Sequence, residues 1–285
     1  MISEVALKAE AELGEGPTWD ITTGTLLWVD VLRSEVHRYH PDRGSDDSSV
    51  LPQHVGAAKP RTRGGLVLNL RDGIALWDRD DSKRWLVYWA RDGVRGNDAA
   101  IDPAGRLWAG TMRYDTAPGG GWLARVEPDG AAKVVLDDVT VSNGIAWSPD
   151  SSLMYYVDTP TRRVDVFDYD RESGDVANRR PLCEVTGEGS PDGICVDVDG
   201  CVWVALWDGA AVRRYTPDGR LDRELQLPVS RPTACCFGGN GFTDLYVTSA
   251  RTDLPEETLA TQPLAGSLFV FPDIAQGTPT PIFTG

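Results

Sequence analysis

Short runs of alternating apolar and polar residues recur along the whole chain, and many are closed by Asp-Gly or Pro-Asp-Gly turns. Residues 25–30, 106–110 and 201–205 are typical runs. A period of two bounded by such turns predicts β-strands. No longer stretch shows a 3.6-residue apolar period, and at residues 254–260 we expect one short helix or a structured loop. The pattern therefore predicts an all-β fold.

Four segments of the chain share a register. Each opens with an oxygen-bearing side chain, has Asp or Ser five positions later, and reaches an aromatic strand residue 11 to 13 positions on. They start at Glu15, Asn97, Asn143 and Asp192. Two weaker copies fill the gaps, at residues 63–67 and 233–237.

The six starts are 48, 34, 46, 49 and 41 residues apart. Several short strands within a repeat of about 40 to 50 residues are typical of a propeller blade. The sequence predicts a six-bladed β-propeller that occupies residues 1–285 as a single domain. To close the ring, we expect residues 1–8 to add a strand to the last blade near residues 267–272.

The first residue of each register is the candidate for chemistry. Innermost strands line a propeller's channel, so Glu15, Asn97, Asn143 and Asp192 are expected to face one another. Two carboxylates and two amides offer oxygen only, and their charge of −2 matches a divalent cation such as Ca²⁺, Mg²⁺ or Mn²⁺, with Fe²⁺ and Zn²⁺ as alternatives. Asn-Gly and Asp-Gly are also common turn dipeptides. The register shared by four segments favours a metal site over simple turns.

The composition of the chain indicates which classes of binding partner to expect. The chain has 285 residues and a net charge of −15 without a basic block, so we expect neither nucleic acid nor an anionic membrane as partner. No apolar run approaches the ~20 residues of a membrane span, and no secretory signal is visible. Five cysteines, without a CxxC, are typical of reduced thiols, and we expect a cytoplasmic protein.

The sequence gives little support for a histidine metal site, a Ser-His-Asp hydrolase or a calcium-binding loop. The three histidines all precede residue 55, and His37 and His40 would point to opposite faces of one strand. No G-x-S-x-G is present, which argues against a Ser-His-Asp hydrolase. Residues 197–200 hint at a calcium loop, but we interpret them as a hairpin turn.

The motifs resemble the senescence-marker-protein/gluconolactonase/luciferin-regenerating-enzyme family, the regucalcin-like propellers. The similar segments follow the family's order and are residues 13–19, 95–98, 102–112, 142–150, 155–158, 191–193 and 236–239. The resemblance implies that Glu15, Asn143 and Asp192 bind the metal, that Asn97 binds metal or substrate, and that Arg95 binds substrate hydroxyls.

One departure concerns the loop after Gly110-Thr111-Met112. Animal members of the family place a substrate-binding Glu there, whereas this chain has Arg113-Tyr114-Asp115-Thr116. Asp115 is a candidate substitute. Residues 250–269 look more like bacterial aldonolactonases, so the resemblance implies a gluconolactone- or pentonolactone-like substrate.

The expected reaction is hydrolysis of a sugar lactone to the aldonic acid. A metal polarises the lactone carbonyl and lowers the pKa of a bound water, and Asp192 is the expected general base. Arg95 and Asn97 would orient the sugar hydroxyls. Two alternatives stay open: a non-catalytic propeller with a structural ion, and a hydrolase of another ester or lactone. The lack of histidine after His54 disfavours lactonases that use a His pair near the metal.

Overall fold

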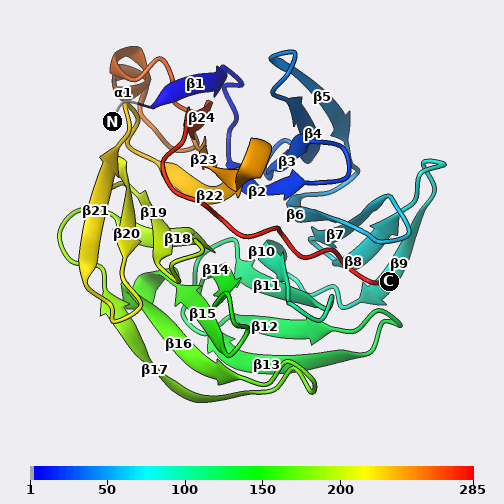
Figure 1. Cartoon of the computed structure of the whole chain (residues 1–285). Helices are drawn as coiled ribbons and strands as arrows, with labels where there is room; N and C mark the ends of the chain where they lie inside the picture. The colour runs from blue at the N-terminus through cyan, green and yellow to red at the C-terminus, as the bar shows by residue number, and fades with distance from the viewer. Residues whose placement is uncertain (1–2) are drawn as a thin grey trace.

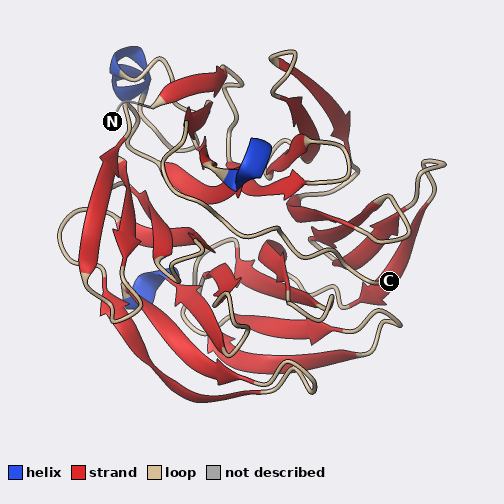
Figure 2. Ribbon diagram, viewed as in Figure 1, coloured by secondary structure: helices blue, strands red, loops and turns tan. Residues whose placement is uncertain are grey.

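Six four-stranded antiparallel sheets surround a central channel, and each sheet forms one blade of a propeller (Figures 1 and 2). The structure is a computed structural model that describes residues 3–285. The predicted all-β, six-bladed propeller is confirmed.

Each blade runs outward from an inner strand at the channel. In chain order the blades comprise β2 (Gly14–Asp20), β3 (Thr25–Asp30), β4 (Glu35–His40) and β5 (Ser45–Val50); β6 (Val55–Pro60), β7 (Leu66–Leu70), β8 (Gly73–Trp77) and β9 (Lys83–Tyr88); β10 (Val94–Ile101), β11 (Leu107–Arg113), β12 (Gly121–Val126) and β13 (Ala132–Val139); β14 (Ser142–Trp147), β15 (Leu153–Asp158), β16 (Arg163–Tyr169) and β17 (Val176–Glu184); β18 (Ser190–Val196), β19 (Val202–Trp207), β20 (Ala211–Tyr215) and β21 (Leu221–Gln226); and β22 (Pro232–Gly238), β23 (Asp244–Ser249), β24 (Leu268–Phe271) and β1 (Glu4–Leu7).

Helices are short. The 3-10 turns η1 (Thr159–Thr161) and η2 (Asn240–Phe242) and the helix α1 (Glu256–Thr261) complete the secondary structure. Helix α1 confirms the short helix expected near residues 254–260. No helix within residues 3–285 is both long and apolar enough to cross a membrane.

The first strand of the chain closes the ring. Strand β1 pairs antiparallel with β24, with Glu4 opposite Val270 and Val5 opposite Phe269. The ring therefore joins an N-terminal strand to three C-terminal ones, which leaves each blade with four strands and covers an otherwise open edge. This confirms the predicted closure for Glu4–Leu7, whereas Met1 and Ile2 lie outside the described residues.

The prediction for the second blade was wrong in its position. Residues 63–65 form a turn and residues 66–67 begin β7, whereas the inner strand is β6. Gly56 occupies the register of Glu15 in this strand. A Cβ at Gly56 would lie 2.3 Å from the backbone oxygen of Asn97, so only glycine allows blades 2 and 3 to approach. Because Gly56 has no polar side chain, the pattern of polar residues that marks the other inner strands is absent from β6.

Every inner strand has an irregular pairing at the same level. The register shifts by one residue between Glu15 and Thr18 in β2, and the other five inner strands shift at the corresponding points. Such a β-bulge redirects side chains and increases the local twist of the strand. The repeated bulge explains why the register residues leave the ordinary strand alternation.

The second half of the repeat has a structural role. The carboxylate of Asp197 accepts backbone N–H bonds from Asp199 and Cys201, both at 3.0 Å, and the Trp203 indole N–H at 2.8 Å. Asp102 does the same for its own turn and for Trp108. In blades 3 and 5 the aspartate five positions after the register residue thus fixes the hairpin turn and the buried indole of the next strand. Residues 197–200 form the predicted hairpin turn.

The C-terminal segment crosses the channel mouth that lies beyond the bulges (Figure 1). Gly277 bridges to Asp197 in blade 5, and Phe283 bridges to Arg61, which directly follows the inner strand of blade 2. The Phe283 ring is fully buried among apolar residues of blades 2 and 3. The tail therefore ties opposite sides of the ring together, an arrangement that the sequence pattern did not predict.

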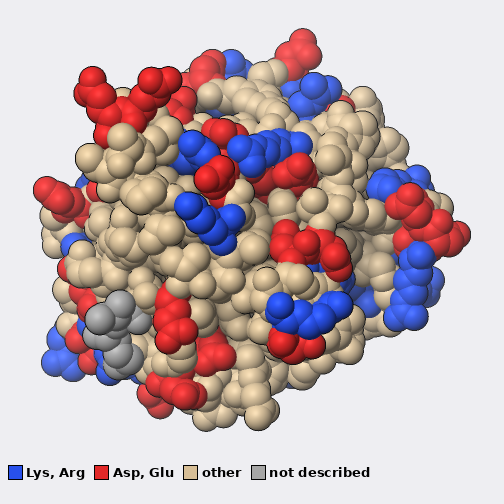
Figure 3. All heavy atoms as spheres, turned by 90° about the horizontal axis from the view of Figure 1, so that it is seen from above, with Lys and Arg blue, Asp and Glu red and all other residues tan. Residues whose placement is uncertain are grey.

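The acidic chain has a mixed surface. On the face shown in Figure 3, basic and acidic side chains lie interspersed. Ion pairs within the described structure are of the same kind: the guanidinium of Arg214 pairs with Asp197, Asp199 and Asp222 at 2.8–3.0 Å. Much of the positive charge is therefore locally neutralised.

Candidate metal and substrate site

The predicted site residues lie at the bulges of four inner strands. Glu15 is on β2, Arg95 and Asn97 are on β10, Asn143 is on β14 and Asp192 is on β18. Their exposed fractions are only 4–7%. Buried polar groups at one level of a channel need partners there, or they destabilise the fold.

Asn97 and Asn143 are in direct contact. The Asn97 amide Nδ2 donates to Asn143 Oδ1 at 2.8 Å and to the backbone oxygen of Ser142 at 2.8 Å. Asn143 Nδ2 donates to Thr159 Oγ1 at 2.7 Å. Because Thr159 takes the Asn143 nitrogen, the Asn143 oxygen is the atom turned toward Asn97.

Arg95 extends this network. Its Nη1 donates to Asn97 Oδ1 at 2.7 Å and to the backbone oxygen of Gly96 at 2.9 Å. Both polar atoms of the Asn97 amide are therefore held, one by Arg95 and the other by Asn143.

The carboxylate of Glu15 sits in an unfavourable environment for a negative charge. Burial raises the pKa of Glu15 from 4.5 to about 8, and the negative charge of Asp98 adds to the rise. A hydrogen bond at 3.0 Å from the Gly16 N–H and the charges of Arg95 and Lys59 act in the opposite direction. The fold thus leaves a negative charge at Glu15 only partly compensated.

Asp192 is buried in the same electrostatic environment. Burial raises the pKa of its carboxyl well above the ordinary value, and the charges of Glu15 and Asp98 add to the rise, while Arg95 lowers it. Its Oδ1 atom is buried and finds no hydrogen-bond partner among residues 3–285. Glu15 and Asp192 therefore interact repulsively, as expected for two carboxyl groups at one level of the channel.

Aspartates at the ends of second strands hold the backbone that leads into two bulges. Asp30 accepts N–H bonds from Glu12 and Leu13 at 2.8 and 3.2 Å. Asp158 does the same for Thr140 and Val141 at 3.2 and 2.8 Å. Each blade thereby fixes the chain two to three residues before its site residue.

Sequence analysis missed several site neighbours. Asn69 Nδ2 donates to the backbone oxygens of Asn97 and Gly110 at 3.0 and 2.9 Å and so supports the bulge of β10. Lys59 is buried and donates to Thr18 Oγ1 at 2.6 Å and to the Gly16 backbone oxygen at 3.3 Å. Lone polar residues within the apolar strands β6 and β7 were the available signal for both.

Asp115, the candidate for the family's substrate-binding Glu, is paired with Arg113. Its two carboxylate oxygens accept from Nε and Nη2 of Arg113, both at 2.7 Å, and its side chain is 57% exposed. The residue before it, Tyr114, instead lies over Arg95, with 6.0 Å from the guanidinium carbon to the ring centre.

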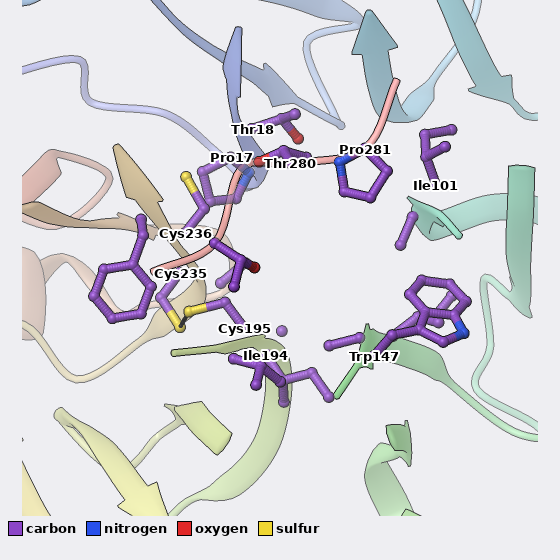
Figure 4. Close-up of a pocket in the computed structure, with 18 of the residues that line it drawn as sticks. Pro17, Thr18, Ile101, Trp147, Ile194, Cys195, Cys235, Cys236, Thr280 and Pro281 are labelled. Carbon is purple, nitrogen blue, oxygen red and sulfur yellow. Dashed lines mark hydrogen bonds between the residues drawn. The ribbon is translucent and has the colours of Figure 1, made fainter. Parts of the chain in front are cut away.

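A separate cavity of about 460 Å³ occupies the channel beyond the bulges, under the C-terminal segment (Figure 4). Its wall includes Ile101, Trp147 and Ile194, and the thiols of Cys195 and Cys235 lie 3.6 Å apart beside it. None of the five predicted site residues lines it. The predicted site is therefore distinct from this cavity.

No group of three or more His, Cys, Asp and Glu side chains within residues 3–285 is arranged to hold a metal ion. The predicted set has only two carboxylates, and its third member is an amide. A set of two carboxylates and one amide therefore differs in composition from such a group, and its oxygens are described above by their own contacts.

Comparison with known proteins shows the family of this chain. Residues 13–251 match the family described as SMP-30/Gluconolactonase/LRE-like region. The chain belongs to this family. All five predicted site residues lie in the part of the chain that matches the family.

Three similar proteins cover almost the whole chain. A 6-deoxy-6-sulfogluconolactonase from Pseudomonas putida is 38% identical, over 96% of this chain and 95% of that protein. Regucalcin from Danio rerio is 36% identical, over 99% and 98%. The crystal structure of regucalcin from Agrobacterium tumefaciens, titled a calcium-binding protein, superposes with a TM-score of 0.95 at 29% identity, over 99% and 97% of the two chains.

Proposed function

We propose that the protein hydrolyses a sugar lactone to the aldonic acid and binds one divalent cation through Glu15, Asn143 and Asp192. Membership of a family that contains lactonases supports the reaction. The observation that carries the proposal for the site is that these three oxygen-bearing side chains, from three different blades, are buried at one bulge level of the channel.

The residues fit a divalent cation. Burial raises the pKa of both carboxyl groups. The charge of Arg95 only partly offsets this for Asp192, and the charges of Arg95 and Lys59 only partly offset it for Glu15. The partnerless Oδ1 of Asp192 and the fixed Oδ1 of Asn143 are available oxygen donors. An oxygen-only set with two negative charges suits Ca²⁺, Mg²⁺ or Mn²⁺, with Fe²⁺ and Zn²⁺ as further candidates. The calcium-binding title of the regucalcin relative agrees with this chemistry.

Such a cation would supply Lewis acidity for the lactone carbonyl and offset the charge of the two carboxylates. Arg95 and Asn97 would bind the sugar hydroxyls, because Arg95 holds the Asn97 amide in a fixed orientation. The N–H donors of Arg95 that the protein does not use would also favour the negative charge that develops on the carbonyl oxygen.

Asp192 would move the proton. The oxygen of a water molecule forms a bond to the carbonyl carbon while the carboxylate of Asp192 takes one of the water's protons. The bond between the carbonyl carbon and the ring oxygen then breaks, and the ring oxygen takes the proton from Asp192. The product is the open-chain aldonic acid, and Asp192 is regenerated.

The test combines chelation with a conservative substitution. Hydrolysis of D-glucono-δ-lactone should disappear after dialysis against EDTA and return when single divalent metals are added back. Asp192→Asn keeps an oxygen donor but loses the proton acceptor, so kcat should fall about 10²–10⁴-fold even with saturating metal.

Asp129→Asn, at an exposed turn, is the matched control and should leave kcat unchanged. Near wild-type kcat for Asp192→Asn at excess metal would remove Asp192 from proton transfer. Full activity after EDTA treatment would remove the cation from the reaction.

A further inference from the structure

Two side chains outside the predicted site meet at the same end of the channel. His54 immediately precedes β6 and Tyr114 immediately follows β11, so the pair joins blades 2 and 3. His54 Nδ1 and the Tyr114 hydroxyl are 2.8 Å apart, and the two rings meet edge to face at 5.6 Å. Tyr114 is 44% exposed, so the pair is open to a ligand.

Tyr114 is one contact away from the predicted substrate-binding residues. Its ring covers the Arg95 guanidinium, whose Nη1 holds the Asn97 amide. A cation over a tyrosine ring is attracted to the face of that ring. The hydrogen-bonded chain that begins at Thr159 ends at Arg95, and the cation–ring contact of Arg95 with Tyr114 joins it to the hydrogen-bonded pair of Tyr114 and His54.

The loop geometry holds Tyr114 in this place. The Tyr114 N–H donates to the backbone oxygen of Gly93 at 2.9 Å, which ties the residue to the start of β10. The paired charges of Arg113 and Asp115 point away into a local ion pair. The loop thus places Tyr114 at the site, whereas the carboxylate of Asp115 is paired with Arg113.

The pair offers neutral hydrogen-bonding groups. Burial lowers the pKa of His54, and the nearby charges of Arg95 and Arg71 lower it further, so the imidazole is neutral near pH 7. When the Tyr114 O–H donates to Nδ1, the Nε2–H becomes a donor and the Tyr114 oxygen keeps an acceptor position. No protein atom within residues 3–285 makes a hydrogen bond to Nε2.

We propose that Tyr114 and His54 are specificity-determining residues that bind ring hydroxyls of the lactone, so that the site selects polyhydroxylated lactones over unsubstituted ones. The Nε2–H of His54 offers a donor and the Tyr114 oxygen an acceptor at separate positions of the pair. These groups match two different hydroxyls of a polyhydroxylated ring, since each hydroxyl both donates and accepts. An alkyl lactone would leave both groups without partners, which disfavours its binding. This inference rests on the proposed function and names residues that would select its substrate.

The test compares two lactones with the same ring. Tyr114→Phe keeps the ring over Arg95 and removes the hydroxyl. For D-glucono-δ-lactone, KM should rise about five- to tenfold with kcat little changed, the effect of losing one hydrogen bond. For δ-valerolactone, which lacks hydroxyls, kcat/KM should not change. His54→Gln should behave similarly, and the double variant should lose less than the product of the two single effects.

Tyr88→Phe, at the end of the outer strand β9 of blade 2, and His40→Gln, at the end of β4 in blade 1, are the matched controls. Binding of D-gluconate by calorimetry gives a second readout and should weaken in Tyr114→Phe by a similar factor. Unchanged gluconolactone KM and gluconate affinity would overturn this inference while leaving lactone hydrolysis intact. Equal losses for both lactones would also overturn it, because Tyr114 would then act only through Arg95. A wild-type protein that neither hydrolyses the lactone nor binds gluconate would refute both proposals.

Discussion

Asn97 donates a hydrogen bond of 2.8 Å to the side-chain oxygen of Asn143 and so links the bulges of blades 3 and 4. Each amide is fixed at its other end, by Arg95 and by Thr159 respectively. A proposed substrate-binding residue therefore orients a proposed metal ligand. Changes at one are expected to affect the other, as is common for groups around a metal site.

Asn143→Asp tests this link. The new carboxylate still accepts from Asn97, and the Thr159 hydroxyl can reverse its role and donate. We expect cation affinity to stay equal or increase, because a charged ligand replaces a neutral one, while kcat decreases less than in Asp192→Asn because the cation polarises the carbonyl less. Calorimetry with Ca²⁺ or Mn²⁺ and lactone kinetics measure the two quantities. Weaker cation binding would show that the amide is not a ligand.

Glu15→Gln separates the ion from the fold. The substitution removes one of two charges that offset a divalent cation, so cation affinity should fall by at least tenfold and activity should be lost. The metal-free variant should be at least as stable as the wild type at pH 9, because a neutral amide has no buried charge. Thermal unfolding with EDTA measures this. An unfolded variant would indicate a structural role for Glu15.

Stability of the metal-free protein should decrease as pH rises. The pKa of Glu15 is about 8 in the folded protein and 4.5 ordinarily, so the folded state binds more protons between these values. Stability from this group is therefore complete below about pH 4.5 and is lost as pH rises through about 8. The raised pKa of Asp192 acts in the same direction.

A divalent cation should counter this loss. The increase in Tm on adding excess Ca²⁺ or Mn²⁺ should therefore be larger at pH 9 than at pH 6, since the cation replaces bound protons. Melting curves at both pH values, with EDTA as the reference, measure it. Equal increases at the two pH values would contradict binding through Glu15 and Asp192.

The turn aspartates should matter for stability alone. Asp197 is buried and holds two backbone N–H groups, the Trp203 indole and Arg214. Asp197→Ala leaves these donors without their acceptor and should destabilise the protein by about 3–5 kcal/mol. Asp199→Ala, whose side chain is 73% exposed, should cost less than about 1 kcal/mol. Urea unfolding at fixed pH measures both, and similar effects would contradict the assigned role.

The sequence by itself determined the architecture and indicated most residues of the candidate site. Alternating strands and a repeated turn aspartate specify blades, because Asp102 and Asp197 act within their own hairpins and leave a local pattern. Glu15, Asn97, Asn143 and Asp192 were recognisable because one bulge recurs at the same point of each inner strand. Where that register holds glycine, at Gly56, the pattern fails and the second blade was misplaced.

Only the tertiary structure decided which neighbours complete the site. Tyr114, His54, Lys59 and Asn69 come from separate strands and loops, and nothing in their local sequence marks the contacts they make across blades. The same holds for Phe283, which is buried only because the C-terminal segment crosses the ring. Local spacing records interactions within a hairpin. Contacts between blades depend on ring closure, which brings together residues that are far apart in the chain.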